Sequence, residues 1–400
     1  MYRLRFNRKM ALVTAILAAF TLFSFQKSNE IKTGTDQSEQ YLPKLEGKKV
    51  AVVANQTTVL LPSRQHLVDY LFEQKVDLVR IFAPEHGFRG NHSAGAHVSN
   101  GKDSKTGLPI VSLYGSNKKP TAAQMDGLDI IIFDIQDVGA RFYTYISTMH
   151  YVMEAAAENG VKVLILDRPN PHGWHIDGPV LKDGFQSFVG MHKIPVIHGM
   201  TIAEYAKMLN GEGWLKNGVK CDLEIVKMQN WTHETRYSLP IAPSPNLPND
   251  LSINLYPSLC FFEGTQVSIG RGTATPFQLI GHPDFEKTNF NSFSFTPKSI
   301  PGVSDHPKLE GKTCYGKDFN VVKDLELILI GAFDLSYLVK CYELSENKAD
   351  FFTAFFDKLA GTDELKKQIK DGMSAVEIKE TWQDDLKAFE AIRSKYLLYP

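Results

Sequence analysis

The sequence has no excess charge of either sign, because 44 lysines and arginines stand against 45 aspartates and glutamates, for a net charge of -1. A chain without a broad positive field is not drawn to nucleic acid or to an anionic membrane, so we expect partners of neither kind. Cysteine is scarce as well. Its four copies form no CxxC pair and match no metal-ligand spacing, so we expect most to be buried free thiols; they are Cys221, Cys260, Cys314 and Cys341.

Several familiar catalytic motifs are missing. No GxSxG elbow is present, which argues against a hydrolase that uses a serine nucleophile. The stretch 270–272, Gly-Arg-Gly, lacks the rest of a dinucleotide-binding fingerprint. His86, His92 and His97 do not fit the helical HExxH spacing of a zinc site. We therefore expect no metal and no cofactor.

After residue 25 the chain has no apolar run long enough to span a membrane. Four basic residues between positions 3 and 9 precede an uncharged apolar run from Met10 to Phe25. This order is typical of a secretory signal peptide, and the run is shorter than the ~20 residues of a spanning helix. We predict a signal peptide over residues 1–26, with an uncleaved amino-terminal anchor as the alternative. The protein would then be exported, periplasmic or secreted, and the polar residues 27–41 would form a flexible tether.

Apolar runs alternate with segments of helical periodicity in the first part of the chain. Continuous apolar strands that alternate with helices are typical of a parallel sheet covered on both faces, so we predict an α/β domain over residues 42–239. Four prolines between positions 240 and 248 mark the predicted boundary. A smaller α+β domain is predicted over residues 240–400. The predicted strands are 49–54, 78–82, 109–113, 129–134, 161–166 and 221–227, and the predicted helices are 64–74, 145–159, 201–210, 325–344, 351–359, 364–370 and 377–396.

Polar residues follow these strands, most clearly where the apolar run 78–82 meets Pro84, Glu85 and His86. Ligands of open α/β sheets bind at the carboxyl ends of the strands, so Glu85 is the first candidate for chemistry. The alternative is that Glu85 pairs with Arg89 to hold the loop. The residues that we expect along this rim are Asn55, Glu85, Gln136, Asp137 and Asp167.

Three clusters could carry chemistry: Glu85, His86 and Arg89; Asp134, Gln136, Asp137, Arg141, Tyr143 and Tyr145; and Asn246, Glu263, Ser268, Arg271 and Thr273. Carboxylates at one sheet rim, such as Glu85 and Asp134, are what a glycosidase requires. The alternative is that Asp134 or Asp137 pairs with Arg141 only to shape the loop. The interleaved aromatic residues suit a sugar, and one of the arginines 89, 141 and 271 could clamp a ligand carboxylate.

Blocks of sequence in a fixed order resemble the exo-acting β-N-acetylmuramidases of the NamZ type. The blocks are Ala83-Pro-Glu-His-Gly-Phe-Arg-Gly90, Asp134-Ile-Gln-Asp-Val-Gly-Ala-Arg-Phe-Tyr-Thr-Tyr145, Leu166-Asp-Arg-Pro-Asn-Pro171, His198-Gly-Met-Thr201, Pro243-Ser-Pro-Asn246, Phe262-Glu-Gly-Thr265 and Gly270-Arg-Gly-Thr273. The resemblance runs from about Leu42 to the carboxyl terminus. It implies a Rossmann-like amino-terminal domain, a smaller carboxyl-terminal domain and an active-site cleft between them, with Glu85 as the catalytic glutamate.

The resemblance also implies the substrate, which is MurNAc-GlcNAc saccharides derived from peptidoglycan, cut to release N-acetylmuramic acid from the non-reducing end. The lactyl carboxylate of that sugar gives a reason for an arginine in the site. Our hypothesis has Glu85 as general acid and Asp134 or Asp137 as its partner, orienting water or the 2-acetamido group, with Glu263 in reserve. A non-catalytic exported protein that binds cell-wall sugars is the alternative, and a metal-dependent amidase or deacetylase is a third.

Overall fold

The structure, a computed structural model, describes residues 30–89, 101–321 and 331–400. The predicted signal peptide over residues 1–26 and the histidines His92 and His97 lie outside the described residues. Residues 32–400 form one compact unit. In the described ranges, no helix has both the length and the apolar character that crossing a membrane demands.

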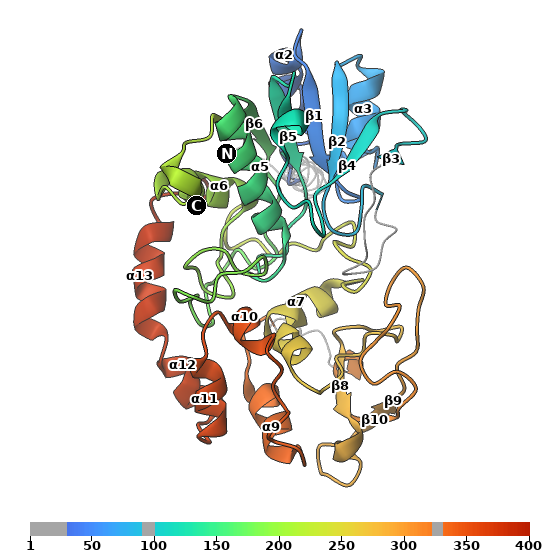
Figure 1. Ribbon diagram of the computed structural model, residues 1–400, viewed down its shortest axis with the longest axis vertical. Helices are drawn as coiled ribbons and strands as arrows, with labels where there is room; N and C mark the ends of the chain where they lie inside the picture. The colour runs from blue at the N-terminus through green and yellow to red at the C-terminus, as the bar shows by residue number, and fades with distance from the viewer. Residues whose placement is uncertain (1–29, 90–100, 322–330) are drawn as a thin grey trace, which may run out of the picture. The chain divides into compact units, whose positions relative to one another are not determined.

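A seven-stranded sheet forms the centre of the first half of the chain (Figure 1), in the order β3-β4-β2-β1-β5-β6-β7. All neighbouring strands are parallel except the short edge strand β3, which pairs antiparallel with β4. The predicted parallel α/β sheet is thus confirmed. Its strands are β1 (Val50–Ala54), β2 (Leu78–Ala83), β3 (Gly101–Lys102), β4 (Pro109–Ser112), β5 (Ile130–Asp134), β6 (Lys162–Leu166) and β7 (Leu223–Val226).

Helices cover both faces of this sheet because successive side chains of a strand point to opposite sides. Val50 and Val52 of β1 belong to a core shared with α2 (Ser38–Leu45) and α3 (Leu67–Glu73). Ala51 and Val53 belong to the other core, which is shared with α4 (Ala122–Met125), α5 (Tyr145–Asn159) and α6 (Ile202–Gly211). The bounds of α5 match the prediction, and Gly160 ends it with a φ of 67°. This second core continues into the carboxyl-terminal part of the chain.

Residues 32–41 are packed, so the predicted tether does not hold over this part of its range. Thr33 and Thr35 have no exposed surface. The Thr33 hydroxyl donates to Asp36 at 2.7 Å, and the Tyr41 hydroxyl donates to the Thr35 carbonyl at 3.0 Å. A polar segment is able to pack when its polar groups find partners inside the fold, which composition alone does not reveal.

The carboxyl-terminal part is smaller and contains a three-stranded antiparallel sheet in the order β8-β10-β9, as the predicted α+β class requires. Its strands are β8 (Leu279–His282), β9 (Phe293–Phe295) and β10 (Cys314–Asp318), and its helices are α7 (Asp250–Leu259), α9 (Ser336–Leu344), α10 (Phe356–Ala360), α11 (Glu364–Lys370), α12 (Ala375–Glu380) and α13 (Gln383–Arg393). The short 3-10 turns are η1 (Lys216–Gly218), η2 (Cys260–Gly264), η3 (Pro283–Phe285) and η4 (Phe319–Val321).

Two predicted helices differ from the structure. Residues 331–335 are not helical, and α9 begins only at Ser336, whose N–H donates to Asp334 Oδ1 at 2.7 Å. The single helix predicted over 377–396 is two helices, α12 and α13, separated near Trp382, which is buried and donates its indole N–H to Asp177. Neither helix nor strand occupies residues 240–249, and the predicted division at residue 240 stays a prediction.

Candidate active site

A tight turn after β2 presents Glu85. The N–H of Gly87 donates to the Pro84 carbonyl at 3.0 Å, and His86 and Gly87 both have a positive φ, of 71° and 77°. Non-glycine residues enter this region at a cost that surrounding structure must offset, and such residues concentrate at functional sites. The sheet therefore ends in a strained turn that holds Glu85 beyond its carboxyl edge.

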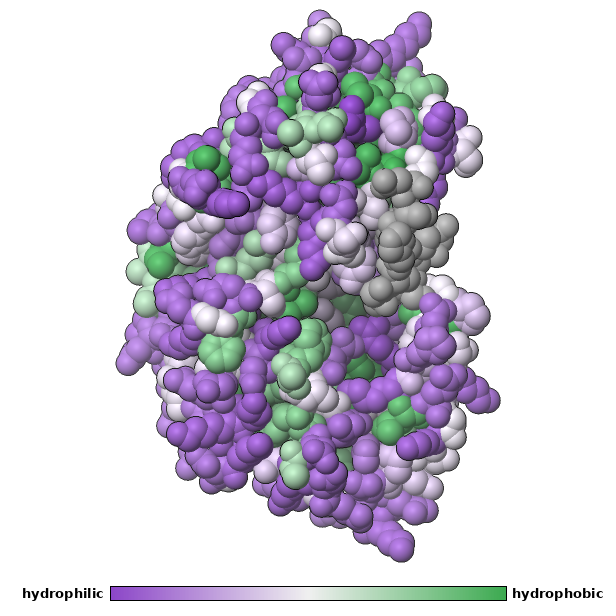
Figure 2. Space-filling view, in the orientation of Figure 1, coloured by the Kyte–Doolittle hydropathy of each residue, from purple (hydrophilic) through white to green (hydrophobic). Residues whose placement is uncertain are grey.

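Glu85 lies in a cleft of about 690 Å³, visible in Figure 2 as a hollow on the molecular face. The cleft is walled by loops that follow β2, β4 and β5 on one side and by residues 244–308 on the other. Its polar and aromatic lining residues include Glu85, His86, Tyr114, Lys118, Tyr143, Thr144, Tyr145, Phe188, Asn246, Tyr256, Glu263, Arg271, Phe277, Asp305 and Lys308.

Two hydroxyl groups approach the Glu85 carboxylate. Thr144 Oγ1 donates to Glu85 Oε2 at 2.8 Å. The hydroxyl of Tyr114 also forms a hydrogen bond with Glu85. Burial first, and the negative charge of Glu85 second, raise the pKa of Tyr114 above its ordinary value, so this phenol stays protonated and donates. Glu85 is thus held in position from two sides.

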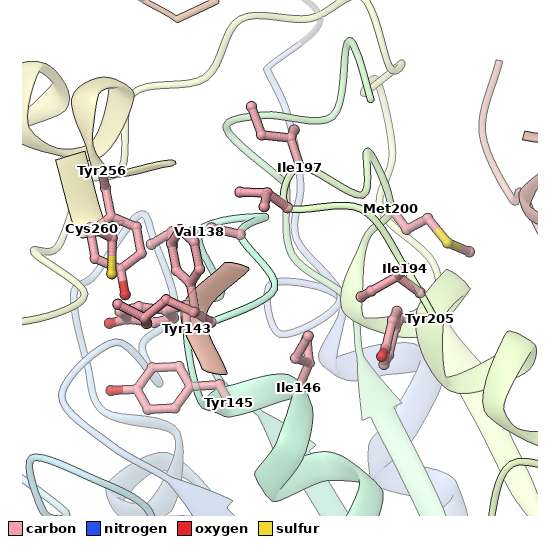
Figure 3. Packing of buried hydrophobic residues seen from close by; sticks show 14 of the residues in the cluster. Val138, Tyr143, Tyr145, Ile146, Ile194, Ile197, Met200, Tyr205, Tyr256 and Cys260 are labelled. Carbon is pink, nitrogen blue, oxygen red and sulfur yellow. The ribbon is translucent and has the colours of Figure 1, made fainter. Parts of the chain in front are cut away.

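Three tyrosine rings form the floor of the cleft. The ring centroids of Tyr143 and Tyr145 lie 4.8 Å apart, and those of Tyr143 and Tyr256 lie 5.7 Å apart. Figure 3 shows Tyr143 between the other two rings. The hydroxyls of Tyr143 and Tyr145 donate to the carbonyl of Pro243, at 2.8 and 3.3 Å, and Tyr145 accepts a hydrogen bond from Asn55. These bonds join the sheet edge to the proline-rich segment.

Arg271 and Glu263 stand at one end of this floor. Arg271 Nε donates to Glu263 Oε1 at 2.5 Å, and the guanidinium carbon lies 5.0 Å from the ring centroid of Phe277. The Arg271 side chain retains 23% of its exposure. Nearby, the ammonium group of Lys308 donates to the carbonyls of Phe262, Thr265 and Val267. Burial lowers the pKa of Lys308 to about 8.

Asn246 lines the cleft and has one side-chain acceptor without a partner among the described residues. Its Nδ2 donates to the Val303 carbonyl at 2.8 Å, which fixes the orientation of the amide. Its Oδ1 is buried and accepts no hydrogen bond from the described residues. A buried acceptor without a donor is costly to the folded protein, so a ligand donor that reached this atom would break no internal hydrogen bond.

Asp134 does not fit its predicted role beside Glu85. It has no exposed surface, does not line the cleft, and binds Arg168 through both oxygens, at 2.5 and 2.9 Å. Arg168 also donates to the Val59 carbonyl at 3.0 Å. The ion pair is a buried structural link between strand ends, and a carboxylate bound in this way is not free to meet a sugar.

Asp137 and Gln136 are also buried away from the cleft. Oδ2 of Asp137 accepts from the N–H of Gly139 at 2.7 Å, and burial raises the pKa of Asp137 to about 7. Gln136 donates to the carbonyls of Asp137 and Pro169. The two side chains shape the loop after β5, so neither fits the predicted contact with substrate.

Two of the three candidate arginines are structural. Arg89 binds Asp103 at 2.9 Å and Asp69 at 3.2 Å, and it lies outside the cleft lining. It does not pair with Glu85 in the bonds that the structure records. Arg141 has no exposed surface and donates to four backbone carbonyls, those of Pro179, Ile194, Leu359 and Ala360. Arg271 is therefore the candidate that reaches the cleft.

Asp167, the last carboxylate predicted at the rim, accepts hydrogen bonds within a buried network and does not line the cleft. It accepts from the Thr201 hydroxyl at 2.8 Å, from the Ala203 N–H at 3.1 Å and from the Tyr399 hydroxyl at 2.6 Å. Burial raises the pKa of Asp167 to about 7. Ser268, another predicted contact, lines a side pocket that shares Glu263 and Arg271 with the main cleft.

Sequence reasoning missed several residues of the cleft. Thr144 lies inside the block 134–145, but its residue type gave no reason to prefer it over its neighbours. Tyr114 follows β4 at the same sheet edge as Glu85, so the position of ligands at the carboxyl ends of parallel strands could have indicated it. Phe188 and Lys308 come from loops without periodicity, and no sequence pattern indicated them.

The residues that the structure describes contain no group of three or more histidine, cysteine, aspartate or glutamate side chains arranged to hold a metal ion. The four cysteines are buried free thiols, as predicted for most of them. Burial raises the pKa of Cys221 and of Cys314 to about 12, so these thiols are unsuited to nucleophilic chemistry.

Comparison with known proteins matches this chain along almost its whole length. The family "Exo-beta-N-acetylmuramidase NamZ, N-terminal" matches residues 50–251, and "Exo-beta-N-acetylmuramidase NamZ, C-terminal" matches residues 254–399. The peptidoglycan beta-N-acetylmuramidase NamZ of Bacillus subtilis (strain 168) is 39% identical over 391 residues, which cover 93% of this chain and 92% of that protein.

Two crystal structures of DUF1343 family proteins from Bacteroides fragilis NCTC 9343 share the fold. One is 46% identical with a TM-score of 0.85, and the match covers 92% of this chain and 99% of that chain. The other is 32% identical with a TM-score of 0.77, over 93% and 100% of the two chains. The arrangement of the parallel sheet and the second, smaller domain is therefore shared with solved proteins.

Proposed function

The chain belongs to the NamZ family of exo-β-N-acetylmuramidases, and from this premise we propose that it releases N-acetylmuramic acid from the non-reducing end of peptidoglycan fragments. The bond cut is the β-1,4 link to N-acetylglucosamine, and Glu85 is the general acid. The protein is a glycoside hydrolase, not the binding protein or the metal-dependent amidase that the sequence left open.

The position of Glu85 carries the proposal. It is a carboxyl group in a cleft of sugar-binding size, next to two hydroxyl groups that fix its orientation. A general acid must lie within hydrogen-bond reach of the leaving oxygen, and the strained turn after β2 holds Glu85 where a substrate in the cleft would meet it. Glu85 protonates the glycosidic oxygen as the bond to C1 breaks.

The second group in the reaction is the 2-acetamido group of the substrate. The carboxylates that line the cleft among the described residues are Glu85, Glu263 and Asp305. Glu263 is bound to Arg271 near Tyr256, at the other end of the tyrosine floor from Glu85. We propose that the acetamide oxygen attacks C1 and that water opens the resulting ring, which leaves the product with retained configuration. Proton NMR of the first product anomer tests this, because inversion would contradict it.

Arg271 and Asn246 are proposed to bind the terminal sugar. The Arg271 side chain is 23% exposed beside Glu263 and lines the cleft, and guanidinium groups recognise a carboxylate in bidentate fashion. The lactyl carboxylate of N-acetylmuramic acid is the matching anion. The unused Oδ1 of Asn246 accepts a hydrogen bond from an N–H or O–H group of the same sugar.

The test of Glu85 compares two leaving groups. A sugar hydroxyl needs protonation to depart, whereas 2,4-dinitrophenolate does not. Glu85→Gln should lower kcat/KM for MurNAc-GlcNAc about 10²–10⁴-fold and lower that for the dinitrophenyl glycoside much less. Glu263→Gln, a carboxylate change in the same cleft, should affect both substrates alike. Equal losses on both substrates in Glu85→Gln would contradict the role of general acid.

We also propose that the enzyme acts outside the cytoplasm. The basic residues between positions 3 and 9 and the apolar run Met10 to Phe25 support export. Cell fractionation of the full chain and of a form lacking residues 1–26 tests this. Retention of both forms in the cytoplasm would contradict it.

A further inference from the structure

An aromatic wall with one cation lies beside Glu85, and the reaction proposed above does not use it. Tyr114, which binds Glu85 through its hydroxyl, has its ring centroid 6.5 Å from that of Phe188. The ammonium group of Lys118 lies 4.6 Å from the Phe188 centroid. All three side chains line the cleft and are half-buried. The wall is therefore open to a ligand that already touches Glu85.

The wall is supported from behind. Tyr151, on α5, stacks on Phe188 with an interplanar angle of 13° and a centroid distance of 6.2 Å. Within residues 30–89, 101–321 and 331–400, the Lys118 ammonium contacts the Phe188 ring and forms no ion pair or hydrogen bond. Its neighbour Lys119, by contrast, pairs with Glu154 and Glu158. Among the described residues, Lys118 is thus a cation at the cleft whose recorded contact is an aromatic ring and whose hydrogen-bond donors have no protein acceptor.

The contacts give the order of groups along the cleft. From Arg271 they pass through Phe277, Tyr256 and Tyr143 to Tyr145, and Thr144, next in sequence, binds Glu85. From Glu85 they pass through Tyr114 and Phe188 to Lys118. In this series of contacts, Glu85 links the residues around Arg271 to the aromatic wall.

The two ends differ in how far their rings are buried. Tyr256 and Phe277, beside the half-buried Arg271, are buried, whereas the rings of the aromatic wall, Tyr114 and Phe188, are half-buried. An exo-acting enzyme needs a deep position for the terminal sugar and an open path for the rest of the chain. The general acid stands between them, because it protonates the oxygen that joins the two.

We propose that Tyr114, Phe188 and Lys118 form the subsite for the leaving part of the substrate. The rings contact the N-acetylglucosamine unit, and the Lys118 ammonium pairs with the lactyl carboxylate of the next N-acetylmuramic acid in a longer fragment. The inference rests on the proposed function, and it adds a chain-length preference. Peptide-free MurNAc-GlcNAc-MurNAc-GlcNAc is cleaved with a higher kcat/KM than MurNAc-GlcNAc.

The first test separates the two sides of the cleft. The β-fluoride of N-acetylmuramic acid has no leaving sugar, so it depends only on the Arg271 end. Phe188→Ala should lower kcat/KM for MurNAc-GlcNAc about tenfold and leave hydrolysis of the fluoride unchanged. The matched control is Phe355→Ala, because Phe355 lines the cleft and its side pocket beside Arg271. This control should not favour one substrate over the other.

The second test concerns the cation. Lys118→Met should reduce the preference for the tetrasaccharide over the disaccharide by about threefold to tenfold, as expected for one partly exposed charge pair. Lys387→Met, an exposed lysine of α13, should leave this ratio unchanged. An unchanged ratio in Lys118→Met, or an equal loss on the fluoride in either cleft variant, would overturn the proposal. If the unaltered enzyme cleaved neither the fluoride nor MurNAc-GlcNAc, the proposed function itself would fail.

Discussion

The hydroxyl of Thr144 donates a hydrogen bond of 2.8 Å to Oε2 of Glu85, and so joins the residue before α5 to the loop that follows β2. Strands β2 and β5, whose following loops carry these two residues, are not neighbours, because β1 lies between them. The bond therefore fixes the orientation of the carboxyl group across the width of a strand. It acts in addition to the turn that presents Glu85.

Replacing Thr144 by valine keeps the shape of the side chain and removes the hydroxyl. A hydrogen bond to a charged group contributes about 1.5–3 kcal/mol, so we expect kcat for MurNAc-GlcNAc to fall by about tenfold or more, with KM little changed. Thr144→Ser should restore activity. The Thr144 side chain makes no capping bond to α5, so the melting temperature should hardly move. A valine variant with normal kcat would contradict the positioning role.

Asn246→Ala tests the unused acceptor. If Oδ1 binds the terminal sugar, its loss should raise KM by about tenfold, in line with one lost hydrogen bond, and should change kcat less. Binding of free N-acetylmuramic acid, followed by calorimetry, should weaken to the same extent. Asn246→Ala also loses the bond to Val303, so unfolding of the free protein must be measured beside it. Unchanged affinity for the sugar would exclude the proposed contact.

Arg271→Met tests recognition of the lactyl carboxylate. The unaltered enzyme should cleave the free acid of a MurNAc glycoside at least about tenfold faster than its methyl ester, because a charge-assisted bidentate pair is lost in the ester. Arg271→Met should abolish this difference, and Arg271→Lys should keep part of it. The ratio of kcat/KM for acid and ester is the measurement. If Arg271→Met still preferred the acid, a residue other than Arg271 would bind the lactyl carboxylate.

Asp137→Asn tests how the buried carboxyl group of Asp137 changes the free energy of unfolding with pH. Burial raises the pKa of Asp137 from 3.8 to about 7, so the folded protein holds a proton that the unfolded chain releases. Its contribution to stability is therefore complete below about pH 4 and is lost as the pH rises towards 7. The asparagine variant has no such loss, so its stability relative to the unaltered protein should rise between pH 4 and pH 8.

Buried histidines change stability in the opposite direction, which is why this prediction compares two proteins at each pH. Burial lowers the pKa of His192 and His198 to about 3, so their contribution is present above pH 6.5 and is lost as the pH falls. Both proteins contain His192, and its effect cancels in the difference of unfolding free energy, whereas His198 lies 3.9 Å from Asp137 Oδ2 and its titration is part of the measured difference. The exposed change Asp222→Asn is the control. A pH-independent difference for Asp137→Asn would contradict the assignment.

The strands and the position of Glu85 could be predicted from sequence because they depend on local patterns. A continuous apolar run identifies a buried strand, and the carboxyl end of a parallel strand identifies the rim. What the rim residues do could not be predicted in this way. Asp134 is occupied by Arg168, 34 positions later, and Arg141 is occupied by the carbonyls of Leu359 and Ala360, more than 200 positions away. Such partners follow from the tertiary fold.

The second wall of the cleft could not be predicted from the sequence either. Residues 303–308 form neither helix nor strand, and they are held in place by Asn246 and by contacts of Lys308 with backbone carbonyls. No periodic pattern of apolar residues in the sequence indicates a loop of this kind. The side of the cleft formed by strand ends was predictable, whereas the side formed by anchored loops was not.

The bond between Tyr399 and Asp167 has a consequence for how the protein is made. The two residues are 232 positions apart, and chains emerge from the ribosome amino terminus first. The sheet can therefore assemble its strands while Asp167 still lacks the phenol that completes its buried site. We expect a nascent chain stalled before residue 399 to hold a loosened sheet, and full resistance of the sheet to protease to arrive only once Tyr399 has bound Asp167.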